Sequence, residues 1–261
     1  MTTTSDLVLR ELSEDGVVTL TLNRPDSFNS LSEAMLAALQ AQFASIQHDE
    51  AVRVVILAAN GRAFCAGHDL KEMRAEPSLD YYQRLFADCT RMMMAIQQLP
   101  VPVIAKVHGV ATAAGCQLVA TCDLAVAAST ARFAVSGVNL GLFCSTPSVA
   151  LSRNLGRKAA FEMLVTGDFI DAEQARAKGL INRVVDAAEL DAATAALASS
   201  ITAKPRAAVA IGKALFYRQL EKGIAAAYDD AGTAMACNMM DEAALEGVQA
   251  FIDKRKPSWS R

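Results

Sequence analysis

The sequence has no excess of positive charge and few aromatic residues. Its 261 residues include 25 lysines and arginines against 28 aspartates and glutamates, which gives a formal net charge of −3. Proteins whose main partner is nucleic acid typically present a strongly basic surface, so no nucleic-acid partner is expected. Aromatic residues make up 6% of the chain and apolar residues 52%, which is typical of a helix-rich globular protein and not of a disordered one. The length fits one large domain or two small ones.

Cysteine and histidine form no pattern that is typical of a metal site or a disulfide framework. The six cysteines include no C-x-x-C pair, and the three histidines have no metal-ligand spacing to them. We therefore expect free thiols in a reducing compartment, and no metal site is predicted.

The chain also lacks an uncharged apolar run long enough to cross a membrane. Its most apolar stretch, Val101–Ala128, contains Lys106, His108 and Asp123, and only fourteen residues separate the last two. A membrane-spanning helix needs about 20 apolar residues, so no membrane partner is expected. The first sixteen residues have neither segment of a secretion signal, and a single arginine among several acids makes a poor transit peptide. We expect a cytoplasmic protein; the alternative, if a transit peptide precedes this sequence, is the mitochondrial matrix.

Short β-branched runs alternate with segments of helical period through the first part of the chain. Two runs flank the acidic turn Glu14-Asp15-Gly16 and predict a hairpin. Ser32 is expected to cap the helix that follows. The alternation predicts an α/β sheet with crossover helices, and helical patterns alone follow Pro147. The expected strands are 7–12, 17–22, 52–58, 101–107, 124–127 and 132–135.

Two turns are built from small residues, and each follows an apolar strand. One is Ala63–Leu70, and the other lies within Ala105–Asp123, where residues 111–115 are Ala-Thr-Ala-Ala-Gly. Small side chains at a strand-to-helix turn let backbone N–H groups approach a ligand, and a helix N-terminus attracts negative charge. A site for a polarised carbonyl is one interpretation. Tight packing of two elements is the other.

Several polar side chains near these turns are candidates for chemistry, and each has a structural alternative. His68 could act as an acid or base near neutral pH, or could be a solvated or hydrogen-bonded side chain. Asp69 is expected to cap a short helix, and Asp123 to be a hydrogen-bonded structural acid. The segment 144–146, Cys-Ser-Thr, resembles a nucleophile in composition. No histidine follows it in the chain, so nucleophilic catalysis is not expected.

Four segments, in matching order and spacing, resemble the enoyl-CoA hydratase/isomerase (crotonase) family. They are LNRPDSFNSL, AFCAGHDLKEM, IAKVHGVATAAGCQLVATCDLAVA and VTGDFIDAEQARAKGLINRVV, and the ending AFIDKRKPSWSR is similar too. The resemblance runs from about Leu7 to Arg261, which is nearly the whole chain. The segment GLFCSTPSVALSR is similar to one subgroup of the family.

The resemblance implies an α/β fold with two parts. Residues 1–195 would form a crotonase-like spiral of β-β-α turns that binds acyl-CoA, and residues 196–261 a helical C-terminal trimerisation region. The oligomer would be a homotrimer or a hexamer built as a dimer of trimers. The implied ligand is an acyl-CoA thioester, with coenzyme A as part of the substrate and no separate cofactor.

The same resemblance implies where the thioester binds. Its oxygen would accept hydrogen bonds from the backbone N–H groups of His68 and Ala114, an oxyanion hole that stabilises an enolate. The basic cluster at 254–256 is expected to be a solvated helix end or to approach the CoA phosphates of a neighbouring subunit. The residues implied to bind substrate are Ser27, Ala66, His68, Asp69, Leu70 and Ala114.

The sequence departs from the family pattern at the acid–base groups. Family hydratases position a water between two glutamates, and those two positions hold Gln117 and Gly137 here. The position of the catalytic glutamate in family isomerases holds Ser145. Because one general acid or base contributes about 10²–10⁴-fold, we expect efficient hydration to be absent.

These departures leave the reaction open. The alternatives are a non-catalytic acyl-CoA binder or another acyl-CoA reaction, such as isomerisation, thioester hydrolysis or decarboxylation. The nearby side chains that could substitute for the missing carboxylates are Asp69, Asn139, Cys144 and Ser145.

Overall fold

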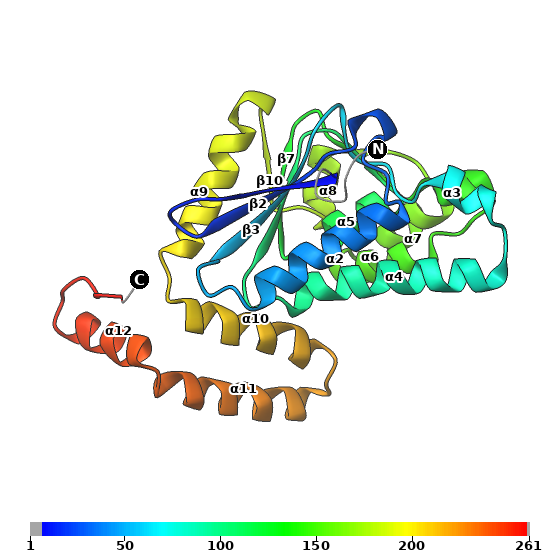
Figure 1. Ribbon diagram of the computed structural model, residues 1–261. Coiled ribbons are helices and arrows are strands. Elements are labelled where there is room, and N and C mark those ends of the chain that lie inside the picture. The colour runs from blue at the N-terminus through cyan, green and yellow to red at the C-terminus, as the bar shows by residue number, and fades with distance from the viewer. Residues whose placement is uncertain (1–6, 260–261) are drawn as a thin grey trace.

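The apolar runs of the sequence form a six-stranded sheet in the computed structural model, which describes residues 7–259 (Figure 1). Its strands are β1 (Val8–Leu12), β2 (Val17–Leu22), β3 (Val54–Ala59), β5 (Val103–Val107), β7 (Leu124–Ala128) and β10 (Arg183–Val185). Their order is β1-β2-β3-β5-β7-β10, and only the β1–β2 pair is antiparallel. This pair confirms the predicted hairpin.

Four shorter strands form a second sheet. They are β4 (Ala63–Cys65), β6 (Val110–Thr112), β8 (Arg132–Ala134) and β9 (Ile170–Asp171), in the order β4-β6-β8-β9. The chain passes from a strand of the large sheet to a strand of the small sheet and then to a helix, and it repeats this path from β3, from β5 and from β7. The repeat confirms the predicted spiral of β-β-α turns.

Helices with one apolar face cover the sheets. In the long helix α4, the buried residues Tyr81, Leu85, Met92 and Ile96 recur at the helical period. The helices are α2 (Glu33–Gln47), α3 (Leu70–Ala75), α4 (Leu79–Gln98), α5 (Ala114–Thr121), α6 (Ser145–Asn154), α7 (Arg157–Thr166), α8 (Ala172–Lys178), α9 (Leu190–Thr202), α10 (Arg206–Leu220), α11 (Ile224–Met239) and α12 (Glu242–Ile252). Three short 3₁₀ segments, η1 (Pro25–Ser27), η2 (Ser136–Leu140) and η3 (Ala187–Glu189), join them.

Polar residues begin several helices where the sequence predicts them. The Ser32 hydroxyl accepts a hydrogen bond from the Met35 N–H at the start of α2. Asp69 caps α3. Asp171 and Gln174 form a reciprocal capping box at the start of α8. These caps satisfy N–H groups that a helix leaves without partners in its own first turn.

The two faces of the large sheet are buried by different helices. Along β3, Val54 and Ile56 pack with Leu197 of α9, whereas Val55 and Leu57 belong to the larger core on the opposite face. This alternation follows from the two-residue period of a strand. In Figure 1, α9 lies on one side of the sheet, and α2, α4 and α5 lie on the other. No helix within residues 7–259 is both long enough and apolar enough to span a bilayer.

A buried lysine fastens α10 to the core. The Lys213 Nζ donates to the backbone oxygens of Ile96 (2.8 Å) and Val101 (2.9 Å) and to Asp123 Oδ2 (2.7 Å). The Tyr217 hydroxyl donates to Asp123 Oδ1 at 2.7 Å. Burial lowers the pKa of Lys213, and Asp123 opposes that shift. Asp123 is therefore the structural acid that was predicted.

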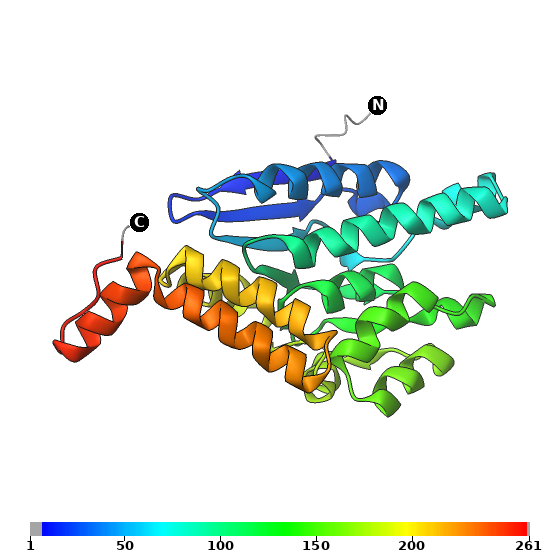
Figure 2. The same cartoon turned by 90° about the horizontal axis from the view of Figure 1, so that it is seen from below.

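Beyond α10 the chain leaves the sheets. Helix α11 packs along α10, on the side away from the sheets in Figure 1, and α12 projects from the body of the molecule in both views (Figures 1 and 2). The predicted division between residues 195 and 196 falls within α9. It stays a prediction.

Replacing Lys213 tests this anchor. Lys213→Met would leave Asp123 buried without its cation, and we expect the free energy of unfolding to fall by about 3–5 kcal/mol. Lys222→Met is the matched control, because Lys222 pairs with Asp230 at the surface (2.7 Å) and should change stability by about 1 kcal/mol or less. Urea denaturation of both variants measures the difference. Equal losses would contradict the assignment.

Candidate functional site

The two small-residue turns of the sequence meet in space. A Cβ built on Gly67 would lie 2.9 Å from the Ala113 Cβ and 3.2 Å from the Ala114 nitrogen. A Cβ on Gly115 would collide with the Cys65 carbonyl oxygen. The end of β4 and the first turn of α5 therefore touch through their backbones, because glycine stands at both contacts.

In the first of these turns, the backbone N–H of His68 is not used in the bridge to Leu31. Leu31 and His68 form an isolated parallel bridge, in which the Leu31 N–H donates to Gly67 O (2.8 Å) and the Asp69 N–H donates to Leu31 O (3.4 Å). In a parallel ladder, the residue between two bonded neighbours directs its own N–H to the opposite side. The His68 N–H therefore points away from Leu31.

The second turn supplies further donors. Helix α5 begins at Ala114, and its N-cap residue Ala113 has no side-chain acceptor for the N–H groups of the first turn. Ala113 has φ 51° and ψ −122°, a conformation that non-glycine residues seldom adopt. Its N–H donates to Ala134 O at 3.0 Å, which holds the turn in place. The His68 and Ala114 N–H groups therefore belong to two segments that touch where Gly67 meets Ala113 and Ala114.

An ion pair supports the His68 turn. The Arg24 Nη1 donates to Asp69 Oδ2 at 2.7 Å, and the other Asp69 oxygen accepts from the N–H groups of Lys71 (3.0 Å) and Glu72 (3.4 Å). Burial opposes ionisation of Asp69, but these hydrogen bonds hold the pKa of its carboxyl below the ordinary value. Asp69 is thus occupied as a cap and an ion-pair partner.

Burial favours the neutral form of the His68 ring. Both ring nitrogens are buried without a partner among the described residues, and the ring meets Phe86 edge-on at 5.5 Å between centroids. Burial lowers the pKa of the imidazole. A neutral imidazole can accept or donate one proton, which is the chemistry that the sequence leaves open for this residue.

Gln117 holds one of the two positions where family hydratases have a glutamate. It lies one turn after Ala114 in α5, is 6% exposed, and its Oε1 has no hydrogen-bond partner within residues 7–259. Buried polar atoms are rarely left unpaired, so such an atom marks a place for a water or a ligand group. The amide of Gln117 can orient such a group but cannot take its proton.

Gly137 holds the other glutamate position, and the space for a side chain there is filled. It is buried in η2, and a Cβ would lie 2.5 Å from Leu142 O and 2.7 Å from the Cys144 Sγ. No carboxylate could extend from residue 137 unless the segment 142–144 moved.

The side chains that could substitute for the missing carboxylates form other interactions or are protonated. The Asn139 Nδ2 donates to Gly167 O at 3.4 Å, and the Ser145 hydroxyl donates to Phe143 O at 3.4 Å. Burial raises the pKa of the Cys144 thiol, so it is protonated near neutral pH. This disfavours a nucleophilic role. Within residues 7–259, no group of three or more histidine, cysteine, aspartate or glutamate side chains is placed to hold a metal ion.

The remaining predicted residues separate into two groups. Ala66 and Leu70 flank the His68 turn, and Ser27 lies in η1, next to Phe28, whose carbonyl accepts the Ala66 N–H at 3.0 Å. The basic cluster 254–256 follows α12 and lies at the opposite end of the molecule from α3 in both views (Figures 1 and 2). Its expected role involves a neighbouring subunit and stays a prediction.

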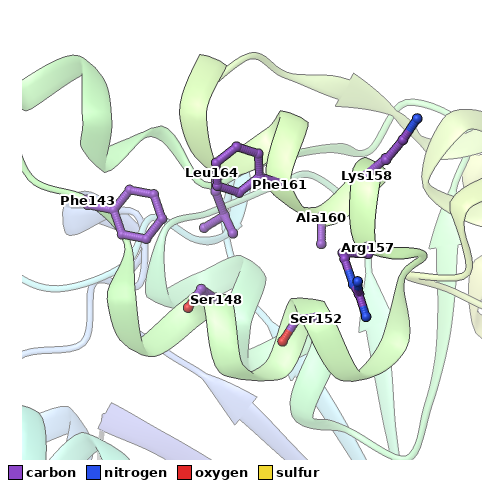
Figure 3. A pocket seen from close by; sticks show the side chains of 8 residues that line it. All are labelled: Phe143, Ser148, Ser152, Arg157, Lys158, Ala160, Phe161 and Leu164. Atoms are coloured by element: carbon purple, nitrogen blue, oxygen red, sulfur yellow. The ribbon is translucent and has the colours of Figure 1, made fainter.

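The sequence did not predict an open pocket of 480 Å³ between α6 and α7. Figure 3 shows Phe143, Phe161 and Leu164 on its apolar side, with Arg157 and Lys158 at the other end. Sequence reasoning also missed Arg24, whose only indication was its place in the segment LNRPDSFNSL.

Comparisons with known proteins agree on one family. Residues 13–261 match the model of the enoyl-CoA hydratase/isomerase family. A crystal structure of enoyl-CoA hydratase from Mycobacterium smegmatis is 69% identical, with a TM-score of 0.96 over 97% of this chain and 98% of that one. The structure of human enoyl-coenzyme A hydratase domain-containing protein 3 is 45% identical, with a TM-score of 0.94 over 97% of this chain and 100% of that one.

A curated relative from the mouse, the mitochondrial enoyl-CoA hydratase domain-containing protein 3, is 47% identical over 95% of this chain and 82% of its own length. The family resemblance of the four segments is confirmed by these matches, and the subgroup to which residues 141–153 are similar is the one that the mouse and human proteins represent.

The contact between the two turns can be tested at Gly115. Gly115→Ala would force the Cys65 carbonyl away, and overpacking of this kind lowers stability by about 1–3 kcal/mol. Gly212→Ala is the matched control, because Gly212 is an exposed residue inside α10 with no atom within 4 Å of its added Cβ. It should leave stability unchanged or raise it by up to about 1 kcal/mol, because alanine favours a helix over glycine. Chemical denaturation compares the two variants, and a neutral Gly115→Ala would show that the turns are not in contact.

Proposed function

The chain belongs to the enoyl-CoA hydratase/isomerase family, and we propose that it binds an acyl-CoA thioester and stabilises the enolate of that thioester. The oxygen would accept hydrogen bonds from the backbone N–H groups of His68 and Ala114. The observation that carries this proposal is the contact of Gly67 with Ala113 and Ala114, which brings the two donors onto adjacent segments. Coenzyme A enters as part of the substrate, and no separate cofactor is proposed.

Backbone donors of this kind contribute to catalysis because negative charge builds up on the oxygen. Removing one oxyanion donor raises the barrier by about 3 kcal/mol in enzymes that depend on it. The two donors belong to backbone turns that are fixed by hydrogen bonds and close contacts with neighbouring segments. They therefore need little reorganisation as the charge develops. Ser27, Ala66, Asp69 and Leu70 surround the first donor and are proposed to line the CoA end of the site.

Proton transfer is the step that the site lacks. A hydratase needs a base for water and an acid for the α-carbon, and neither Gln117 nor Gly137 supplies a carboxylate. We therefore propose that standard hydration is inefficient. The closed space at Gly137 also supports the second candidate, a non-catalytic acyl-CoA binder. A third is a reaction in which enolate stabilisation does most of the work, such as decarboxylation, isomerisation or thioester hydrolysis.

Crotonyl-CoA tests this proposal directly. With both carboxylates absent, we expect hydration to be at least about 10²-fold slower than that of a two-glutamate hydratase in the same assay, since each group is worth about 10²–10⁴-fold. Loss of the enoyl absorbance measures the rate, and titration calorimetry with butyryl-CoA and with CoA measures binding. Turnover equal to the reference hydratase would refute the carboxylate argument, and failure to bind butyryl-CoA would refute the site.

A product screen separates the candidates that remain. Enoyl-, saturated and malonyl-type thioesters would be incubated with the protein and analysed by mass spectrometry. Binding without any product supports the non-catalytic role. Released CoA, a shifted double bond or loss of carbon dioxide supports the corresponding reaction.

We further propose a homotrimer, alone or paired into a hexamer. Large apolar side chains on α11 and α12 are exposed in the single chain, among them Tyr228 (73%), Met235 (71%) and Phe251 (85%). Contiguous exposed apolar surface typically marks an association site. The name of the mouse relative places that protein in mitochondria, which supports the matrix as the location here. The cytoplasmic location expected from the N-terminus finds no support there.

A charge on α11 tests the oligomer. Met235→Glu should shift the protein toward monomers in sedimentation velocity, because a carboxylate at an apolar interface loses hydration without a partner. Leu79→Glu is the matched control, since Leu79 on α4 is equally exposed at 71%. It should leave the sedimentation coefficient unchanged. A monomeric parent protein, or identical behaviour of the two variants, would contradict the proposal.

A further inference from the structure

We infer that Asn29 is a positioning residue for the His68 oxyanion donor, an inference that rests on the proposed function. Its hydrogen bonds go to Arg24, Asn60 and Ala63 and not to either donor. Its side-chain amide links the segment at Arg24 to both ends of the β3–β4 turn, which precedes the His68 turn in the chain.

The Asn29 side chain is completely buried and uses both ends of its amide. Its Oδ1 accepts from the Arg24 N–H at 2.8 Å. Its Nδ2 donates to Asn60 O at 2.8 Å and to Ala63 O at 2.9 Å. These carbonyls lie at the two ends of the β3–β4 turn, and β4 leads directly to Gly67 and His68. One side chain therefore fixes where β4 begins.

The backbone of Asn29 contributes as well. Its φ is 53°, in the left-handed region, which asparagine tolerates better than most residues. The chain on both sides of this bend, at Phe28 and at Leu31, forms hydrogen bonds with the 66–69 segment. Phe28 O accepts the Ala66 N–H at 3.0 Å, and Leu31 exchanges hydrogen bonds with the residues that flank His68.

The contacts around Asn29 require a side chain that donates two hydrogen bonds at this position. Both partners of Nδ2 are carbonyl oxygens, so a carboxylate in its place would set acceptor against acceptor. Aspartate nevertheless keeps the shape of asparagine and its tolerance of positive φ, and glycine keeps the conformation while removing the side chain. Asn29→Asp and Asn29→Gly therefore remove the ties by two different routes.

Butyryl-CoA labelled with ¹³C at its thioester carbonyl reports the donor geometry without requiring turnover. In the parent protein, hydrogen bonds from the oxyanion donors should lower the infrared stretching frequency of the bound carbonyl. In both Asn29 variants we expect the frequency to return toward that of free butyryl-CoA. The preference for butyryl-CoA over CoA should fall at least about tenfold, the weight of one strong hydrogen bond, with CoA affinity nearly unchanged.

Asn154→Ala is the matched control. Its Nδ2 also donates to two backbone carbonyls, those of Ala120 (2.9 Å) and Ala150 (2.8 Å), but it joins α6 to α5 away from both turns. This variant should lose some stability in chemical denaturation while its bound carbonyl keeps the parent frequency.

The possible failures are distinct. If the folded Asn29→Gly or Asn29→Asp variant keeps the parent carbonyl frequency, the positioning role is refuted while the proposed function stands. If Asn154→Ala changes the frequency as much as they do, the effect is general loosening and the positioning role is again refuted. If the parent protein prefers butyryl-CoA no more than CoA, the proposed function fails and this inference fails with it.

Discussion

The backbone contact between the end of β4 and the first turn of α5 is the constraint on which the rest of the site depends. Gly115 is the residue that permits it, because any side chain there would meet the Cys65 carbonyl. Ala113 is held at positive φ beside it, a conformation that costs about 1–3 kcal/mol and persists only where the surroundings enforce it. The Ala113–Ala134 hydrogen bond and the contact with Gly67 provide that enforcement. The donors are consequently rigid.

The charges around this contact are arranged so that the site is nearly neutral. Arg24 pairs with Asp69, and burial favours the uncharged forms of His68 and Cys144, because it lowers the pKa of the imidazole and raises the pKa of the thiol. A neutral surrounding with fixed N–H dipoles stabilises a developing negative charge on an oxygen. It offers little help in moving protons. Under the proposed function, the backbone donors would therefore be present without the side chains that move protons.

Local signals in the sequence predicted local structure well. Ser32 and Asp69 each cap the helix that they were expected to cap, since a cap depends on only three or four neighbouring residues. The strands β4 and β6 and the helix α6 were not predicted, and the expectation that helices alone follow Pro147 was wrong, because the short strands β9 and β10 lie beyond it. β6 is only three residues long, too short to show a period, and α6 has no side-chain cap at its start.

The parts that escaped prediction depend on long-range contacts. The two small-residue turns were visible separately, but their meeting joins Gly67 to Ala113 across forty-six positions, and only the family resemblance placed them together. Nothing in the spacing of α10 marks Lys213 as the partner of Asp123, because a lysine on a helix is ordinarily solvated.

The absence of the two glutamates involves the backbone as well as the two side chains. At Gln117 a carboxylate would have nearly the same shape as the amide, whereas at Gly137 the main chain of Leu142 and the thiol of Cys144 fill the space. A glutamate at position 137 would therefore require a different course of residues 142–144, which places this departure in the backbone as well as in the side chain.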